Sequence, residues 1–226
     1  MDATFDIIRD GLERLRTAKR LPKVFGAESH GFKLKPRLSE SVVEKFEAKH
    51  RIRLPEDYRG FLIDLGNGGA GPFYGVFELG EMDDSFDFQK WKEGDGFVGV
   101  LSKPFPHTKP WNDLPEEPKE TDDEEEYDKA LEAFDAIYWN PDNVNGAIPI
   151  CHEGCAIRDW LVVTGSEAGH IWRDSRTDQA GLRPVSFGKK KRVWTSPRLA
   201  GAELRVYSPA GGFTHGDGAT DFHSGI

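Results

Sequence analysis

Three metal-capable or nucleophilic side chains fall within five residues, at Cys151, His152 and Cys155. A structural zinc site needs four ligands and normally recruits a second ligand pair, whereas the other histidines of this chain are scattered. A thiol nucleophile would need an adjacent base, but neighbouring residues of an extended strand point to opposite faces, which separates Cys151 from His152. Because Cys151 ends an apolar run, we expect it to be a small buried core residue, and we predict no metal site.

Other patterns have the residue types of a catalytic or nucleotide site without its context. The string G-x-G-x-x-G occurs at residues 66–71 and 94–99, yet neither copy follows a strand and opens a helix, as dinucleotide binding requires. Ser166 directly follows Gly165, so the G-x-S-x-G nucleophile turn is missing. Neighbouring aspartates are expected on the surface of a chain with 31% charged residues. We therefore predict no catalytic residue, no cofactor and no enzymatic activity.

The strongest signal is an acidic run at residues 113–128. It holds ten acids against one base, Lys119, while the rest of the chain is balanced at 29 acids and 29 bases, so the run accounts for the net charge of −9. Acids in the first turn of a helix interact favourably with its dipole by about 0.3–1 kcal/mol each, which explains Asp122, Asp123 and Glu124. The acids that precede the helix repel one another, so they favour a surface that faces a basic partner.

The candidate partner-binding residues combine this charge with a tryptophan that we expect to be an exposed aromatic anchor. They are Trp111, Asp113, Glu116, Glu117, Asp123, Glu124 and Glu125.

Composition excludes several other partners. The balanced charge outside the acidic run disfavours direct nucleic-acid binding, which concentrates basic residues on one face. No apolar stretch approaches the roughly 18 residues that span a bilayer, and the N-terminus MDATFDIIRDGLERL lacks the pattern of a secretory signal. Two cysteines cannot form a disulfide framework. We expect a cytoplasmic protein that binds neither membrane nor nucleic acid.

Apolar spacing predicts the elements that would position these residues. We expect helices over residues 5–21, 38–50, 55–65 and 121–138, and strands over residues 72–80 and 97–101. Further β-rich runs between residues 147 and 187 are separated by short glycine-containing turns, which predicts an antiparallel meander. The fold class is therefore α+β.

Local signals predict where the helices begin and end. Ser39 or Ser41 is the expected N-cap of the helix at 38–50. Ser41 with Glu44, and Thr121 with Glu124, each match the S/T-x-x-E pattern of a capping box. Gly66 follows an apolar helical face and is expected to cap it in the left-handed conformation.

A helix followed by the string LPEDYRGFL and the turn GNGGAGP resembles the SUKH superfamily, which includes fungal Smi/Knr-type regulators of cell-wall synthesis. The later strings PFPHTKPWNDLP and GAIPICHEGC…WLVVTGSEAGHIWRD are similar to blocks of its bacterial members. The resemblance implies a structural role for the residues that match its motif, which are Leu54, Pro55, Tyr58, Phe61, Leu62, Gly66, Asn67, Gly68 and Gly69.

The resemblance also implies a domain organisation. N-terminal helices would pack on a bent antiparallel sheet within residues 38–187, after an N-terminal helix and linker at residues 1–37. Bacterial members usually end in a helix rich in Trp, Tyr and Leu, whereas this chain continues with GKKKRVWTSPRLAGAEL after Phe187. We expect residues 188–226 to be a weakly ordered segment, which is either a divergent extension or the product of an altered reading frame.

Finally, the resemblance implies a function. Bacterial members are mostly immunity proteins that bind and block polymorphic or contact-dependent toxins, many of them nucleases or deaminases. We therefore expect a non-catalytic immunity protein whose acidic run faces a basic toxin domain. Two alternatives stay open: a regulatory protein-binding scaffold of the fungal type, and an enzyme that uses either Cys151 and His152 or the aspartates.

Overall fold

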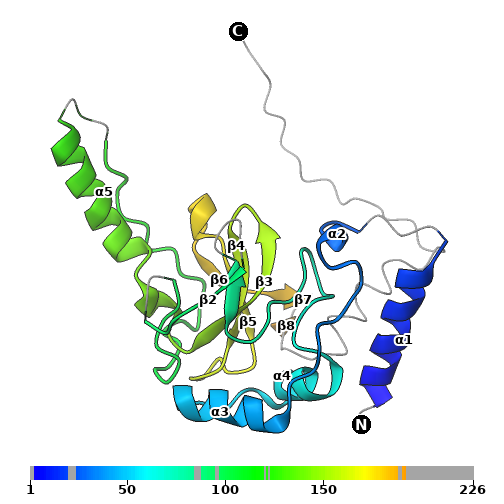
Figure 1. Cartoon of the computed structure of the whole chain (residues 1–226). Coiled ribbons are helices and arrows are strands. Elements are labelled where there is room, and N and C mark those ends of the chain that lie inside the picture. The colour runs from blue at the N-terminus through cyan, green and yellow to red at the C-terminus, as the bar shows by residue number, and fades with distance from the viewer. Residues whose placement is uncertain are drawn as a thin grey trace.

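The computed structural model describes residues 3–19, 24–83, 88–94, 97–119, 121, 123–187 and 190–191 of the chain. It shows an α+β fold in which helices of the N-terminal part and an antiparallel sheet enclose one hydrophobic core (Figure 1). This agrees with the fold class expected from the sequence. Apart from β8 (Lys190–Lys191), the segment expected to be weakly ordered, 188–226, lies outside the described residues.

The central sheet is the antiparallel meander that the sequence predicts. Its strands β3 (Ala147–Gly154), β4 (Ile157–Val162), β5 (Ile171–Asp174) and β6 (Leu182–Pro184) pair in sequence order. Trp160 and Trp172 are register partners, and both are fully buried. The β3–β4 pairing shifts register twice, as expected where a strand bulges and bends.

Two small β-pairs accompany this sheet. One joins β1 (Glu81–Asp83) to β2 (Phe88–Lys90), and the other joins β7 (Ser186–Phe187) to β8. The strand expected at residues 72–80 is wrong, because Val76 forms only isolated bridges there, to Gly69 and Cys151.

The strand expected at residues 97–101 is also wrong. Val98 and Leu101 are fully buried, which is why the segment has the composition of a strand. Two of its backbone amides, however, bond to side chains, because the amide of Val100 donates to Asn145 Oδ1 and the amide of Leu101 donates to Glu93 Oε1. No sheet partner is needed for these donors.

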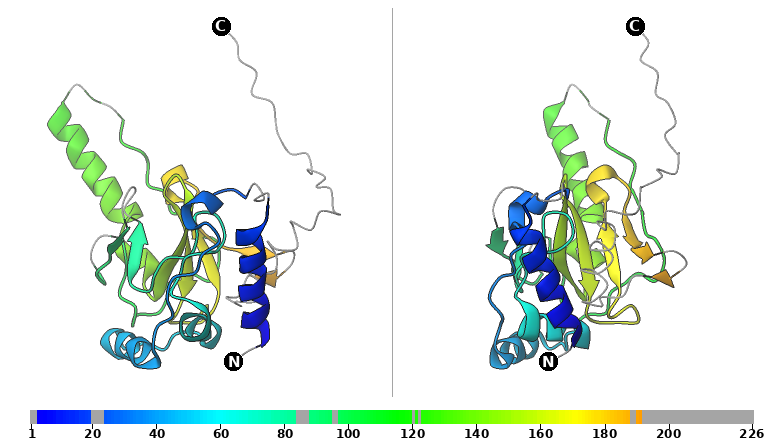
Figure 2. Two further views of the ribbon diagram at one scale, coloured as in Figure 1. Left: turned by 45° about the vertical axis from the view of Figure 1, so that its right-hand side comes forward. Right: turned by 90° about the vertical axis from the view of Figure 1, so that its right-hand side faces the viewer.

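The N-terminal helices pack around the 61–65 segment. Helix α1 (Ala3–Thr17) buries Phe5 and Ile8 and contacts η1 (Phe61–Leu65), while the Arg9 guanidinium donates to the backbone oxygen of Asp64 at 2.9 Å. Helix α3 (Glu40–His50) also contacts η1, and the one-turn helix α2 (Ala27–His30) precedes it. Figure 2 shows these helices from two further sides.

The helix expected at residues 55–65 is divided into two parts. Helix α4 (Glu56–Gly60), with Pro55 at its N-cap, continues directly into the π-helical turn η1. Gly66 does not adopt the predicted left-handed cap, because its φ of 176° is extended. A Cβ at Gly66 would lie 2.8 Å from the backbone oxygen of Lys35, so this glycine permits a close backbone approach. The left-handed glycines follow it at Gly68 and Gly69.

Both predicted capping boxes are wrong. Helix α3 begins after Ser39, which is one of its two expected N-caps. The Ser39 side chain makes no capping hydrogen bond, however, and its hydroxyl lies 3.0 Å from that of Ser41. Helix α5 (Glu124–Tyr138) begins after Asp123 rather than Thr121, because Asp123 Oδ1 accepts hydrogen bonds from the first-turn amides. A carboxylate at this position satisfies donors that the helix itself cannot.

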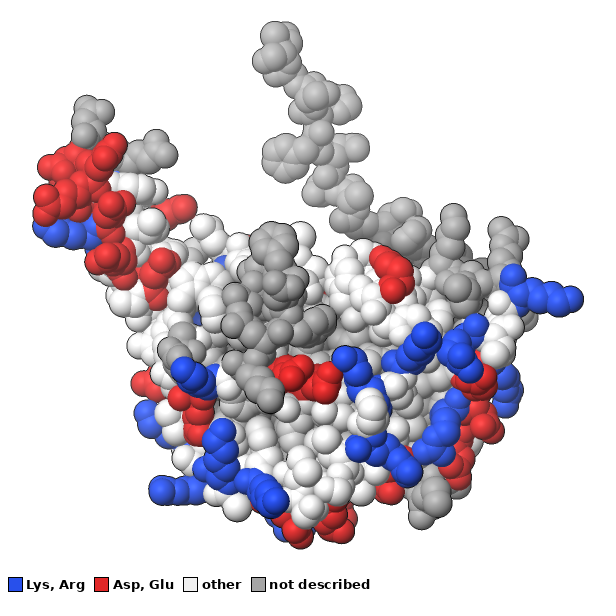
Figure 3. Space-filling model, viewed as in Figure 1, with Lys and Arg blue, Asp and Glu red and all other residues white. Residues whose placement is uncertain are grey.

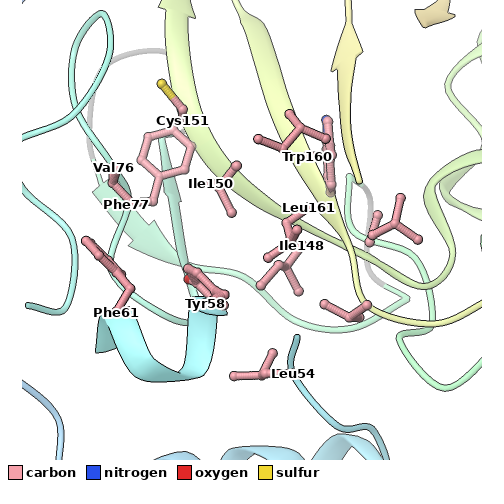
Figure 4. Packing of buried hydrophobic residues seen from close by; sticks show 14 of the residues in the cluster. Leu54, Tyr58, Phe61, Val76, Phe77, Ile148, Ile150, Cys151, Trp160 and Leu161 are labelled. Carbon is pink, nitrogen blue, oxygen red and sulfur yellow. The ribbon is translucent and has the colours of Figure 1, made fainter. Parts of the chain in front are cut away.

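The core joins the residues of the resemblance motif to the sheet. Leu54, Tyr58, Phe61 and Leu62 are all buried, and Figure 4 shows the first three facing side chains of β3, β4 and the 76–77 segment. Asn67 extends this packing with hydrogen bonds, since its side chain accepts from the Leu79 amide. These side chains therefore contribute to the packing and hydrogen bonding of the core.

Candidate protein-binding site

The acidic run lies on a part of the molecule that projects from the body. Residues 112–119 form an irregular strap that leads toward α5, and we call residues 112–138 the acidic arm. In Figure 1 the arm extends away from α3 and α4, and in Figure 3 acidic side chains gather at its far end. The sequence predicted the charge, whereas the projection is a feature of the tertiary structure.

The predicted acids of the strap and the first turn are exposed. Asp113, Glu116 and Glu117 are exposed on the strap, and Glu124 and Glu125 are exposed at the start of α5. Within the described part of the arm, the ion pair present joins Lys129 Nζ to Glu125 Oε1 at 2.8 Å. Most of the negative charge of the arm is therefore not neutralised by a neighbouring base.

Asp123 has a structural role in addition to its charge. Its Oδ1 lies 3.1 Å from the Glu125 amide nitrogen and 3.2 Å from that of Glu126. This cap fixes the start of α5, where acidic side chains interact favourably with the helix dipole. Replacing Asp123 would therefore change the helix as well as the surface.

Trp111 is not the exposed anchor that we expected. Its side chain is partly buried, packs against the core, and stacks on Tyr138 with ring centroids 5.8 Å apart and on His107 at 5.1 Å. Its backbone forms a bridge with Leu182 of β6, with both hydrogen bonds at 2.7–2.8 Å. Trp111 therefore fixes the base of the arm to the sheet instead of presenting a ring to a partner.

Tyr138 joins both ends of the arm to the body. Its hydroxyl donates to Asn112 Oδ1 at 2.8 Å and accepts from the Gly181 amide at 3.2 Å. The Asn112 side chain in turn donates to the backbone oxygen of Gln179. Burial raises the pKa of the Tyr138 hydroxyl further above neutral pH, which favours the protonated form that this network uses.

A buried arginine completes the base of the arm. Arg176 makes a bidentate contact with Asp174, through Nη2 to Oδ2 at 2.7 Å and Nε to Oδ1 at 2.9 Å, and Nη1 donates to the backbone oxygen of Tyr138. Its guanidinium also lies over the ring of Trp139, 4.9 Å from the centroid. The cation is therefore satisfied on several sides, which a buried charge requires.

His107 packs beside this base. Its Nε2 donates to the backbone oxygen of Asn143 at 3.0 Å. Burial, together with the nearby positive charge of Arg176, lowers the pKa of His107. The neutral imidazole is thus the form that the folded protein favours.

A groove runs between the strap and α5. Its volume is about 540 Å³, and its lining is mostly apolar. Tyr127, Phe134 and Ile137 contribute side chains from the helix, and Pro115 and Pro118 contribute the opposite wall. The sequence identified the acids of the arm but not this groove, because residue pattern does not show that the strap lies beside the helix face.

The anchoring residues were also missed. Asn112, Tyr138, Arg176 and Gly181 have no distinctive spacing, and only the fold brings them together. The one available signal was that Tyr138 continues the apolar spacing of the helix, which predicted burial but not its hydrogen bonds.

The cysteine cluster has the geometry expected of core and turn residues. Cys151 is 1% exposed, and its thiol lies 3.3 Å from the backbone oxygen of Pro72. His152 stacks on Tyr74 outside the core, and Cys155 is exposed in the β3–β4 turn. Among the described residues, no group of three or more His, Cys, Asp or Glu side chains is arranged to hold a metal ion.

In the part of the chain that the structure describes, no helix has the length and apolar character needed to cross a membrane. Comparison with known proteins found no matching family model, no matching curated protein and no matching solved structure.

Proposed function

We propose that this chain is a non-catalytic immunity protein, which binds a cognate toxin and occludes its active domain with the acidic arm. The observation that carries the proposal is the concentration of exposed, largely unpaired acids on a projecting arm whose base is fixed to the sheet. The resemblance of residues 38–187 to SUKH immunity proteins supports the same function.

The arm suits a cationic partner for two physical reasons. Unpaired surface charge steers an oppositely charged partner and accelerates association. A rigid arm loses less conformational entropy on binding than a loose loop would. The hydrogen bonds of Tyr138 and Arg176 provide that rigidity at the point where the arm leaves the body. Basic nuclease and deaminase domains are the class of toxin that fits this charge.

The test is co-expression of the chain with the C-terminal domain encoded by the neighbouring gene, followed by measurement of growth and of complex affinity. We expect rescue of growth and a stoichiometric complex whose affinity falls steeply with salt. The triple variant Glu117→Lys/Glu124→Lys/Glu125→Lys should weaken the complex and flatten its salt dependence. None of these three residues caps the helix or anchors the arm.

A matched control applies the same charge change to the body. Asp10, Glu44 and Glu56 are exposed and lie on α1, α3 and α4. The variant Asp10→Lys/Glu44→Lys/Glu56→Lys should bind nearly as well as the parent chain. If the two triple variants weakened the complex equally, net charge and not the arm would determine binding, and occlusion by the arm would be rejected.

A further inference from the structure

The face of α5 that lines the groove is more apolar than an exposed helix needs. Tyr127, Ala130, Phe134 and Ile137 follow one another at spacings of three, four and three residues, so they share one side of the helix. Ile137 is 57% exposed although its neighbours on this face are apolar. A helix that projects from a domain gains most of its stability from covering such a face. The strap covers only part of it.

The rim of the groove has the opposite character. Glu116 and Glu117 line it from the strap and Glu126 lines it from the helix, while Lys119 is the base that lines it among the described residues. An apolar floor bordered by carboxylates is complementary to a segment that carries an apolar stripe bordered by lysines or arginines. The carboxylates therefore favour a partner with positive charge, and the apolar floor favours a partner with an apolar face.

We propose that the groove binds a basic amphipathic helix of the partner protein, with the apolar face of that helix against Phe134 and Ile137 and its basic residues against the rim. This inference rests on the proposed function, because it specifies which part of a cationic partner the acidic arm contacts.

A helix fits the groove better than an extended segment does. An added β-strand needs a row of open backbone donors and acceptors. The backbone of α5 is paired within the helix, and Pro115 and Pro118 of the strap have no N–H to donate. A helix satisfies its own backbone and binds through side chains alone, as the lining of this groove requires.

The probe is a designed 18-residue peptide of leucine and lysine, with the leucines spaced to form one face of a helix. Its control is a peptide of the same composition with the leucines distributed around the helix. Binding to the full chain is measured by fluorescence anisotropy at several salt concentrations. We expect the amphipathic peptide to bind at least about tenfold more tightly than the control, since tenfold corresponds to about 1.4 kcal/mol.

Two alanines on α5 provide a matched pair of variants. Ala130 lines the groove, whereas Ala136 is exposed, does not line it, and lies roughly a third of a turn from Ala130 around the helix axis. Glutamine is a good helix former, so Ala130→Gln and Ala136→Gln should both fold. We expect Ala130→Gln to weaken peptide binding about five- to tenfold by filling the floor, and Ala136→Gln to leave it unchanged. Glu116→Gln/Glu117→Gln should flatten the salt dependence.

Several outcomes would overturn the groove as a helix-binding site. Equal binding of the two peptides, or equal effects of Ala130→Gln and Ala136→Gln, would mean that charge alone attracts the probe. Tighter peptide binding after removal of residues 192–226 would identify the chain's own C-terminal segment as the occupant, and a concentration-dependent dimer sensitive to Ala130→Gln would identify a second copy. None of these results contradicts the proposed function. That function would be rejected separately, if the parent chain failed to protect cells against the toxin.

Discussion

The hydroxyl of Tyr138 lies 2.8 Å from Asn112 Oδ1, which ties the last residue of α5 to the first residue of the strap. The same hydroxyl accepts a hydrogen bond from the Gly181 amide at the edge of the sheet. One side chain therefore connects both ends of the acidic arm to each other and to the body. This connection fixes the base of the arm to the surface of the body.

Tyr138→Phe should destabilise the protein by about 1–3 kcal/mol, because it leaves the buried Gly181 amide without its acceptor and Asn112 without its donor. Urea unfolding would measure this loss. Tyr127→Phe, on the same helix, is the control and should change stability by less than about 0.5 kcal/mol. If both variants unfolded at the same urea concentration, the hydrogen bonds of Tyr138 would not hold the arm.

Arg176→Met should lower the free energy of unfolding by about 3–5 kcal/mol, because it leaves the carboxylate of Asp174 buried without a cation. The substitution also removes a donor to the Tyr138 carbonyl. Chemical denaturation again provides the measurement. Lys129→Met breaks the exposed pair with Glu125 and should cost no more than about 0.5 kcal/mol. A small loss at Arg176 would show that the base of the arm tolerates an unpaired Asp174.

Stability should decrease as the pH falls below about 6.5, in part because of His107. The folded protein lowers the pKa of His107 below its ordinary value of 6.5, mainly through burial. At a pH between the folded-state pKa and 6.5, His107 is protonated in the unfolded chain but neutral in the folded protein. The stability that His107 contributes is therefore complete above pH 6.5 and is lost as the pH falls through the folded-state pKa.

His107→Gln removes this titration and retains a donor for the Asn143 carbonyl. Melting temperatures measured from pH 7.5 to 5 should therefore decline less steeply for the variant than for the parent chain. His30, whose pKa burial also lowers, would account for part of the decline that is left. Parallel curves for the two proteins would contradict the assignment to His107.

Gly181→Ala should destabilise the protein at least twice as much as Gly31→Ala. Both glycines have positive φ values, 66° and 53°, so alanine is strained at either position by about 1–2 kcal/mol. At Gly31 a Cβ would meet no atom within 4 Å, whereas at Gly181 it would overlap the backbone oxygen of Trp111. Thermal unfolding distinguishes the two variants. Equal losses would mean that the strap can shift away from the sheet without cost.

Much of the fold could be predicted from the sequence. The meander from β3 to β6 follows from closely spaced β-rich runs, and the helices follow from apolar spacing. The strand wrongly expected at residues 97–101 shows why apolar pattern can mislead. Residues 97–101 look like a strand because Val98 and Leu101 are buried, but side chains of Glu93 and Asn145 take the place of a sheet partner. A pattern of apolar residues indicates burial, but it does not identify the hydrogen-bond partners of the backbone.

The candidate site could likewise be predicted only in part from the sequence. The sequence by itself determined where the negative charge lies, because charge is a property of residue types and the run at 113–128 is continuous. Only the tertiary structure decided that this charge stands on an anchored arm, that Trp111 belongs to its base, and that an apolar groove lies beside it. The anchoring depends on contacts between residues far apart in the chain, and the groove depends on how the strap lies against the helix, and local pattern carries no information about either.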